Sequence, residues 1–292
     1  MKPIIISAVL LAGFALGVRA AGLKECTFTQ VINDVNVTAA ATKASQAAKV
    51  NDSFKAPDLI RTGAKSRAEL QAPDKTLTRI GANTVFSIEP AGRNLKLEQG
   101  SLLFHSPAGK GGGTIKSAGA SASVLGTTLL VACTLDGGFK TIVLEGRGTV
   151  TLTNGRVKIL KAGEMIFIPP GAKDFGPLIL INLDKLVGGS SLVGGFPAPL
   201  PSLPSIRAAI SRQNLALAAG RVIDTGAFIG GSGLGNDPKI ISPSQAGFAV
   251  GLVFEQKASE KPSVVFPRPA GFAGGPVFEQ KAIEKPSAVG QP

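Results

Sequence analysis

The side chains that commonly carry catalysis or bind metals are scarce in this sequence. His105 is the only histidine among 292 residues, and it ends the apolar run "LLFH". A zinc or iron site takes three or four ligands, and no cysteine or second histidine is placed to help His105. We therefore expect no metal site, no cofactor and no catalytic role for this histidine.

Acid–base chemistry and phosphate binding are also poorly supported. General acid–base catalysis needs two carboxylates that face one pocket, and the acidic residues of the chain are scattered without a recurring pair. The runs "GKGGGT" (Gly109–Thr114) and "GGSGLG" (Gly230–Gly235) lack the Lys-Ser/Thr of a phosphate loop and open no helix. The sequence therefore predicts a protein that is not an enzyme. An enzyme with a site that sequence does not reveal remains an alternative.

Two cysteines, Cys26 and Cys133, have no CxxC spacing, so they do not form a redox or metal pair of that kind. In an oxidising compartment they could form a disulfide, closing a loop of about 100 residues that the chain-entropy model values at about 4–5 kcal/mol. Because both lie in apolar, strand-like sequence, two separate buried thiols are the other interpretation. The sequence leaves both open.

The stretch "LIRTGAKSRAEL" carries Arg61, Lys65 and Arg67 around a Thr-Gly turn. It is either an anion-binding loop or a structural turn between two strands that happens to be charged. We favour the structural turn, in which Gly63 supplies a backbone conformation that other residues adopt only with strain. The three charges, together with Arg79, would then add to a basic binding surface.

The formal net charge is +12, and the excess of Lys and Arg lies mostly before residue 187. A basic exported protein would be attracted to anionic envelope polymers or lipid headgroups. The expected partner is an envelope protein or an anionic envelope polymer. Nucleic acid is not an expected partner, because the chain has no Trp and no Tyr for base stacking.

The N-terminus, "MKPIIISAVLLAGFALGVRA", has the pattern of a secretory signal peptide spanning residues 1–20. Small residues precede the expected cleavage point after Ala20. The alternative is an uncleaved membrane anchor, although the apolar run is shorter than the roughly 20 residues of a membrane span. No later segment has the length and apolar character of a span. We expect a soluble mature protein that is periplasmic, in the outer envelope or secreted.

Residues 21–186 read as an all-β domain of short strands, rich in β-branched residues and broken by turn residues. Asn154-Gly155 in "TNGR" and the run "DGG" at Asp136–Gly138 predict β-hairpins. The Ala-rich stretch Thr38–Val50 is expected to be a loop or a single helical turn.

Glycines recur at intervals near 20 residues in this region, as expected if each layer of the fold consists of two short strands and their turns. The spacing alone leaves a sandwich, a barrel and a solenoid open, and we expect an elongated β-solenoid or a sandwich. The glycines that we expect at structural turns include Gly63, Gly126, Gly146 and Gly155.

The composition changes after residue 186. Residues 187–204 are rich in Gly, Ser and Pro and are expected to form a linker, and residues 205–224 show the apolar spacing of a helix. Residues 225–292 are a low-complexity tail in which residues 246–265 recur as residues 270–289 with 16 of 20 positions identical. The tail is either disordered or a repeated linear motif, centred on "VFEQKA", that anchors a partner through Phe254 and Phe278.

Five stretches resemble, in order, the periplasmic domain of the FecR (ferric citrate regulator) family. They are "LIRTGAKSRAEL", "TLTRIGANTVFSI", "NLKLEQGSLLF", "SASVLGTTLLVACTLDGGFKTIVLEGRGTVTL" and "RVKILKAGE", within residues 53–164. The resemblance implies that Thr62, Gly63, Ser66, Arg67 and Ala68 form a strand, a turn and a strand. It also implies that Gly126-Thr127 opens a strand and that Glu145-Gly146 closes the next one.

The resemblance implies an exported, non-enzymatic β domain that binds or scaffolds other envelope components. The best-known members sense an occupied iron transporter in the outer membrane and signal to a cytoplasmic anti-sigma segment. This chain departs from the family pattern at Pro73–Thr76, where an Asp-Gly turn is common, and at Leu125, where Arg is common. A regulator of iron-transport signalling, anchored by an uncleaved N-terminal helix, is therefore kept as the alternative function.

Overall fold

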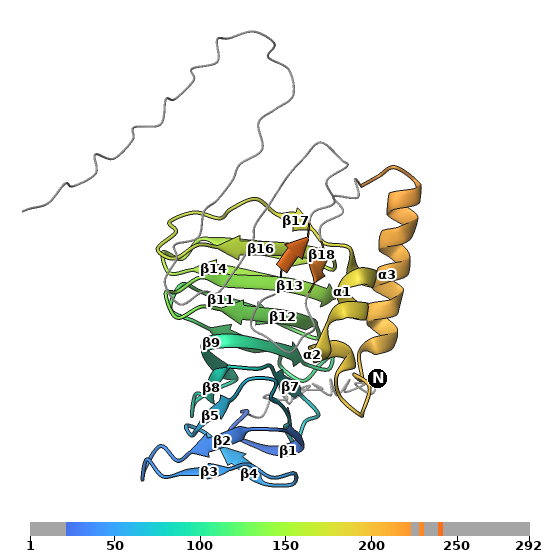
Figure 1. Ribbon diagram of the computed structural model, residues 1–292. Helices are drawn as coiled ribbons and strands as arrows, with labels where there is room; N and C mark the ends of the chain where they lie inside the picture. Colours follow the sequence, from blue (N-terminus) through green and yellow to red (C-terminus); the bar gives the residue numbers. More distant parts are fainter. Residues whose placement is uncertain (1–21, 223–227, 231–238, 242–292) are drawn as a thin grey trace, which may run out of the picture.

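The strands stack like rungs, and the chain climbs from β1–β4 at one end to β16 and β17 at the other (Figure 1). A computed structural model describes residues 22–222, 228–230 and 239–241. The all-β prediction is confirmed, and within this part of the chain the fold combines both expected forms, a sandwich of two sheets built as a stack of two-stranded layers. The strands are β1 (Glu25–Ile32), β2 (Val35–Thr38), β3 (Ser45–Ala47), β4 (Ser53–Lys55), β5 (Leu59–Thr62), β6 (Arg67–Gln71), β7 (Leu77–Ile80), β8 (Val85–Ile88), β9 (Asn94–His105), β10 (Gly113–Lys116), β11 (Ala120–Val124), β12 (Thr128–Cys133), β13 (Phe139–Glu145), β14 (Arg147–Leu152), β15 (Val157–Lys161), β16 (Glu164–Ile168), β17 (Ile179–Leu180), β18 (Phe228–Gly230) and β19 (Lys239–Ile241).

Two sheets face each other. Sheet A runs in the order β4-β1-β6-β7-β9-β12-β13-β16-β17, and sheet B runs in the order β3-β2-β5-β8-β9-β10-β11-β14-β15. These pairs are antiparallel except β9 with β10. Most layers therefore hold one strand of each sheet.

Strand β9 belongs to both sheets. Its first half pairs with β8 and β10 in sheet B, and its second half, from Gly100, pairs with β7 and β12 in sheet A. Gly100 makes this change of sheet possible because its φ is +93° and because a Cβ there would lie 2.6 Å from the Cα of Thr84. The two sheets are thus held together by a continuous strand as well as by their packing.

Two apolar layers stabilise the fold. The first fills the space between the sheets, with Phe28, Phe54, Phe86 and Phe104 fully buried. The second lies between the outer side of sheet A and the helical segment that follows β17. Strand β13 is buried on both sides, which explains why Ile142, Val143 and Leu144 are apolar without alternation.

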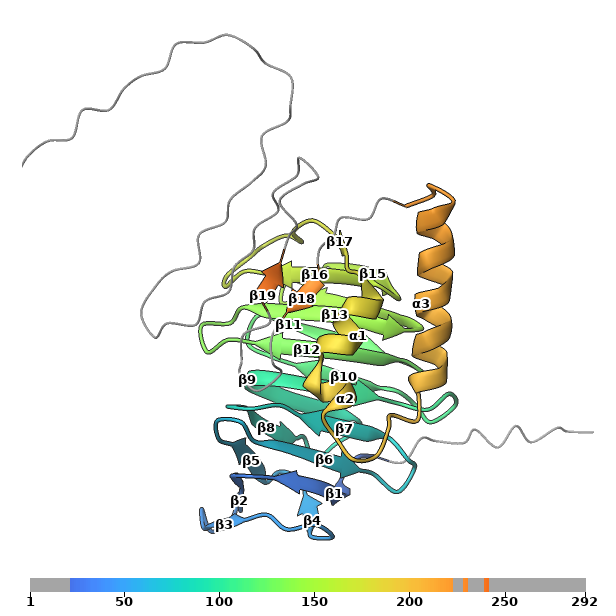
Figure 2. The same ribbon diagram turned by 45° about the vertical axis from the view of Figure 1, so that its right-hand side comes forward.

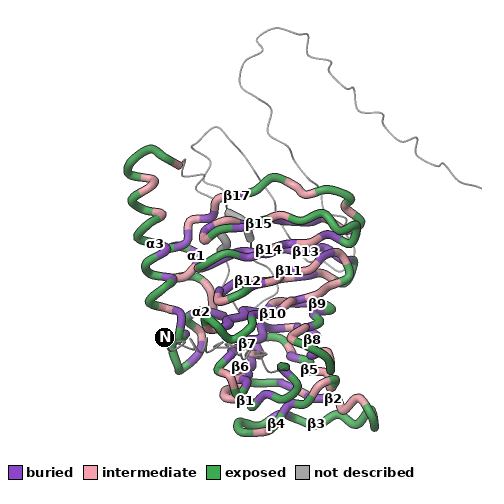
Figure 3. The backbone as a smooth tube through the Cα atoms, turned by 180° about the vertical axis from the view of Figure 1, so that it is seen from behind, coloured by how far each residue is buried: buried purple, intermediate pink, exposed green. Residues whose placement is uncertain are grey.

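The helices are α1 (Leu183–Gly189), α2 (Ser191–Gly194) and α3 (Leu203–Ala218), and both views place them along the same side of the stack (Figure 2). Asn182 caps α1 by accepting a hydrogen bond from the backbone N–H of Lys185. The side chain of Gln213, on α3, accepts from the N–H of Leu183 and donates to the carbonyl of Ile181. Helix α3 is therefore fastened to the start of α1, and much of its length stays exposed (Figure 3).

The expected linker at residues 187–204 needs correction. The segment contains α2 and buries Leu192, Val193, Phe196 and Leu200 against sheet A. The segment was predicted to be a linker because it is rich in Gly, Ser and Pro. Its four apolar residues nevertheless pack against the sheet, so it is an ordered segment of mostly irregular backbone. The helix predicted at 205–224 exists but spans Leu203–Ala218, and Gly220, with φ +64°, follows its end.

The hairpins predicted at Asn154-Gly155 and at Asp136–Gly138 are confirmed as the β14–β15 and β12–β13 connections. The stretch Thr38–Val50 forms a hairpin in which β3 returns along β2, and its tip closes a single turn through the hydrogen bond from the Lys43 N–H to the Ala39 carbonyl. No helix in the described part of the chain is long and apolar enough to cross a membrane. The predicted signal peptide and the duplicated tail segments lie outside the described residues.

Candidate functional site

The four arginines and lysines predicted to form one binding surface separate onto different parts of the fold. Arg61 points outward from β5 in sheet B and is exposed, and Lys65 is exposed in the β5–β6 turn. Arg67 is half-buried on sheet A, with its guanidinium carbon 5.8 Å from the centre of the Phe196 ring. Arg79 is completely buried. The prediction of a single basic surface is therefore wrong for Arg79, which no solvent-borne partner can reach.

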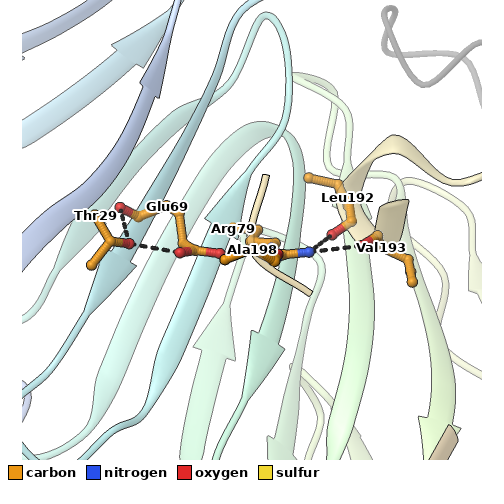
Figure 4. Close-up of polar contacts among 6 residues, drawn as sticks. All are labelled: Thr29, Glu69, Arg79, Leu192, Val193 and Ala198. Carbon is orange, nitrogen blue, oxygen red and sulfur yellow. Dashed lines mark hydrogen bonds and ion pairs between the residues drawn. The ribbon is translucent and has the colours of Figure 1, made fainter. Parts of the chain in front are cut away.

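Arg79 instead forms a buried clamp (Figure 4). Its Nε donates to Glu69 Oε2 at 2.7 Å. Its Nη1 donates to the carbonyls of Leu192 and Val193 at 3.1 and 2.7 Å, and Nη2 donates to the carbonyl of Ala198 at 2.6 Å. Carbonyls near the end of a short helix thus receive a charged donor that stays ionised at neutral pH.

Two further residues complete the clamp. The hydroxyl of Thr29 donates to Glu69 Oε1 at 2.7 Å, and the ring of Phe196 covers the Arg79 guanidinium at 4.4 Å from its centroid. Burial lowers the pKa of Arg79, while the hydrogen bond and charge of Glu69 act in the opposite direction. The clamp fastens residues 192–198 to sheet A and therefore fixes which face of the sandwich is covered.

Sequence reasoning missed this pair, although a signal for it existed. Glu69 and Arg79 stand directly opposite each other in the β6–β7 hairpin. The turn at Pro73–Thr76 is tight, with Lys75 in the left-handed region at φ +70°. If residues are paired across the hairpin starting from that turn, Glu69 and Arg79 fall opposite each other.

Gly63 lies at the predicted turn, but the physical reason for glycine there differs from the one we expected. Its φ is not in the left-handed region; the left-handed residue of this turn is Lys65, at φ +56°. A Cβ on Gly63 would lie 2.6 Å from Asp34 Oδ2. Glycine is thus required here by the close approach of Asp34. Gly126, Gly146 and Gly155 do occupy positive φ at turns, as expected.

His105 belongs to a short buried chain of polar groups. Its Nδ1 lies 2.9 Å from Thr128 Oγ1, and the Thr128 hydroxyl donates to Glu145 Oε1 at 2.7 Å. Because that hydroxyl hydrogen points at Glu145, we assign the proton on His105 to Nδ1. Burial lowers the pKa of His105 and raises that of Glu145. Among the described residues no group of three or more His, Cys, Asp or Glu could hold a metal ion.

Cys26 and Cys133 are free, buried thiols, which corresponds to the second interpretation of the cysteines. They lie on β1 and β12, which are separated in sheet A by β6, β7 and β9, a distance of about 19 Å at ~4.8 Å per strand. A disulfide needs Cα atoms within about 7 Å. Burial raises the pKa of each thiol to about 12.

The outer side of sheet B is the broad surface that no described helix covers, and we call it face B. Its side chains are small and polar over much of its length. Thr114 and Ser123 are hydrogen-bonded across β10 and β11, and Ser121 and Ser123 stand opposite Thr151 and Thr149 on β14. Face B comprises Asn36, Thr38, Leu59, Arg61, Ser87, Asn94, Lys96, Glu98, Thr114, Lys116, Ser121, Ser123, Arg147, Thr149, Thr151, Val157, Ile159 and Lys161.

The charges of face B are only partly neutralised. Lys96 pairs with Glu98 at 2.8 Å and Lys116 pairs with Glu89 at 2.9 Å, and both pairs are accessible to solvent. No acidic residue of the described part lies within ion-pair distance of Arg61, Arg147 or Lys161. Face B therefore offers hydroxyl groups and unpaired positive charge on a flat support, an arrangement suited to binding an acidic partner.

Comparison with protein families identifies the central part of the chain. Residues 58–147 match the family described as "FecR protein". The resemblance to FecR is thereby confirmed, and the match includes Glu69, Arg79 and much of face B. A comparison with curated proteins found no match.

Two solved structures match part of this chain. Both are crystal structures of a candidate anti-sigma factor from Parabacteroides distasonis ATCC 8503, at 1.65 and 2.50 Å resolution. Each is 19% identical, with TM-scores of 0.39 and 0.40, and the matches cover 44% and 47% of this chain. They span 61% and 64% of those chains, which is less than two thirds of their length.

Proposed function

We propose that this is an exported FecR-domain protein of the bacterial cell envelope that acts by binding another envelope protein rather than by catalysis. The main support is that the two outer faces of the sandwich differ: one is covered by helices and the other by none of the described helices. The chain's own helices occupy the outer side of sheet A and are held there by Arg79. Face B is left for a partner.

The partner that suits face B is acidic. Arg61, Arg147 and Lys161 are exposed and have no ion-pair partner among the described acids. The rows of Ser and Thr add hydrogen-bonding groups that lose little side-chain entropy on binding. A partner protein would gain both specificity and a faster encounter from this pattern.

A second candidate function is regulation of envelope signalling, and it is supported by the FecR match at residues 58–147. In that version the partner is an occupied outer-membrane transporter, and residues 1–20 remain as a membrane helix. N-terminal sequencing of the protein purified from cells separates the two. A mature N-terminus at Ala21 supports the exported binding module, and an intact Met1 supports the anchored regulator.

The binding function is tested by capture from envelope extracts with the full chain as bait. The variant carrying Arg61→Glu and Arg147→Glu should lose a partner protein that the native chain retains. The matched control carries Arg207→Glu and Arg212→Glu on the exposed side of α3, which changes the net charge equally. Equal capture by both variants would contradict the use of face B. If the native chain retains only an anionic polymer, and does so in a salt-sensitive way, the partner is a polymer and not a protein.

A further inference from the structure

Strand β15 ends sheet B at the upper end of the stack, and among the described strands it pairs only with β14. No described strand pairs with its other side, which we call the open edge. Residues 173–175 lie beside the start of this edge, through contacts with Asn154, Arg156 and Lys158. It is also the longest of the four strands at the ends of the two sheets: β15 has five residues, β3 and β4 have three each, and β17 has two. Short end strands are a common protection against unwanted strand pairing, and β15 lacks that protection.

The backbone groups on the open edge can be assigned from the register. The N–H of Leu152 donates to the carbonyl of Arg156, so this pair and every second pair after it are hydrogen-bonded. The N–H and C=O groups of Val157, Ile159 and Lys161 therefore point away from β14. The Lys161 N–H is satisfied by Glu164 Oε2 at 2.7 Å, which agrees with this assignment.

Val157 and Ile159 are the other two residues of β15 whose backbone groups face the open edge. Their side chains project from face B. These apolar side chains are 59% and 62% exposed. Both are β-branched and stand next to Thr151 and Thr149 of β14. No proline and no register shift interrupts the β14–β15 ladder, so the edge keeps the regular spacing that an added strand requires.

The surroundings of the edge are positive. Arg147, Lys158, Lys161 and Lys173 lie on or beside it, with Lys158 over the ring of Phe175. The acids beside it are Glu164, at the Lys161 N–H, and Asp174, which is paired with Arg156 at 2.7 Å, so the balance is positive. A second copy of the chain, paired edge to edge, would bring these lysines against their own counterparts. Like charges opposite each other destabilise a strand pair, so the edge suits an acidic strand better than a copy of itself.

We propose that β15 is a docking edge that takes up an extended segment of the partner protein, with alternating apolar and acidic residues, as an additional strand of sheet B. This inference rests on the proposed binding function and specifies how the partner is held. Main-chain hydrogen bonds to Val157 and Ile159 supply the attachment. The lysines select acidic side chains, and the exposed valine and isoleucine pack against the apolar ones.

The test uses the full chain and a fluorescein-labelled peptide in which valine and glutamate alternate, with binding followed by fluorescence anisotropy. The control peptide has lysine in place of glutamate. We expect saturable binding of the first peptide and none of the second. Methylating the backbone nitrogens of one alternating set of residues should weaken binding roughly tenfold or more, because those N–H groups face β15, and methylating the other set should not.

On the protein, Ile159→Asn should weaken peptide binding by a similar factor, because it removes an apolar contact without changing the charge. Leu135→Asn is the matched control, since Leu135 is 74% exposed in the β12–β13 turn, and it should bind as the native chain does. Circular dichroism of both variants establishes that they are folded.

Equal effects of the two methylated peptides would overturn the proposal, as would unchanged binding by Ile159→Asn. A dimer in sedimentation that Ile159→Asn abolishes would assign the edge to a second copy. Binding that appears only after removal of residues 242–292 would assign it to the chain's own tail. Each of these outcomes contradicts an acidic partner strand. If the peptide fails while envelope capture still depends on Arg61 and Arg147, the docking edge is wrong and the binding function stands.

Discussion

Replacing Arg79 by methionine should destabilise the protein far more than replacing any exposed charge. Methionine keeps part of the side-chain volume but removes every donor of the guanidinium. Glu69 would then stay buried with only the Thr29 hydroxyl as a partner, and the carbonyls of Leu192, Val193 and Ala198 would lose theirs. The segment after α2 would be held by apolar packing alone.

The expected magnitude follows from the burial of both charges. Side-chain exposure is 0% for Arg79 and 5% for Glu69. Removing one partner of a buried ion pair costs about 3–5 kcal/mol, because the other charge is left buried and uncompensated. For a domain of this size, each kcal/mol lowers Tm by about 2–4 °C, so Arg79→Met should lower Tm by about 6–20 °C.

The assay is urea unfolding followed by circular dichroism, with two control variants. Lys55→Met removes one partner of an exposed pair with Glu25 and should cost less than about 1 kcal/mol. The double variant Glu69→Leu with Arg79→Met should recover much of the stability, since no unpaired charge remains. If Arg79→Met unfolds within about 1 kcal/mol of the native chain, the clamp does not hold the helical segment as we argue.

Three further predictions concern individual side chains. Cys26 and Cys133 should react with a thiol reagent only after unfolding, and a reductant should leave Tm unchanged; rapid labelling of the folded chain would contradict their burial. Burial raises the pKa of Glu145, so the folded state binds its proton more tightly than the unfolded state, and its contribution to stability is lost as the pH rises through the folded pKa. Glu145→Gln should therefore flatten the fall in unfolding free energy above the ordinary glutamate pKa of about 4.3, and an unchanged pH profile would refute this. Gly63→Ala should be destabilising and Asp34→Ala should rescue it, because the added Cβ would lie 2.6 Å from Asp34 Oδ2; a lack of rescue in thermal unfolding would show that another contact is responsible.

Local patterns in the sequence were sufficient to predict much of the fold. Asn154-Gly155 and Asp136–Gly138 specify their hairpins through backbone conformations that few residues adopt, so they could be predicted without knowledge of the rest of the chain. The glycine spacing near 20 residues indicated two strands per layer. It could not decide between a solenoid and a sandwich, because that depends on how the layers pair.

The candidate site was less predictable because it depends on contacts between distant segments. Charged residues are rarely buried without a partner, so Arg79 was assigned to the surface, and the carbonyls that hold it lie more than 110 residues further along the chain. The same contacts concealed the role of residues 187–204, whose composition is typical of a linker. Face B follows from this docking: which side of the sandwich stays uncovered is decided by where the helical segment packs.

Crosslinking from face B in living cells would show whether a partner protein binds this surface. A photoreactive residue would replace Ser87 or Thr149 on face B, and Leu215, 66% exposed on α3, would serve as the control position. Both face B positions should yield a crosslinked product with the same envelope protein, and Leu215 should not. A product formed from Leu215 but from neither face B position would contradict partner binding at face B.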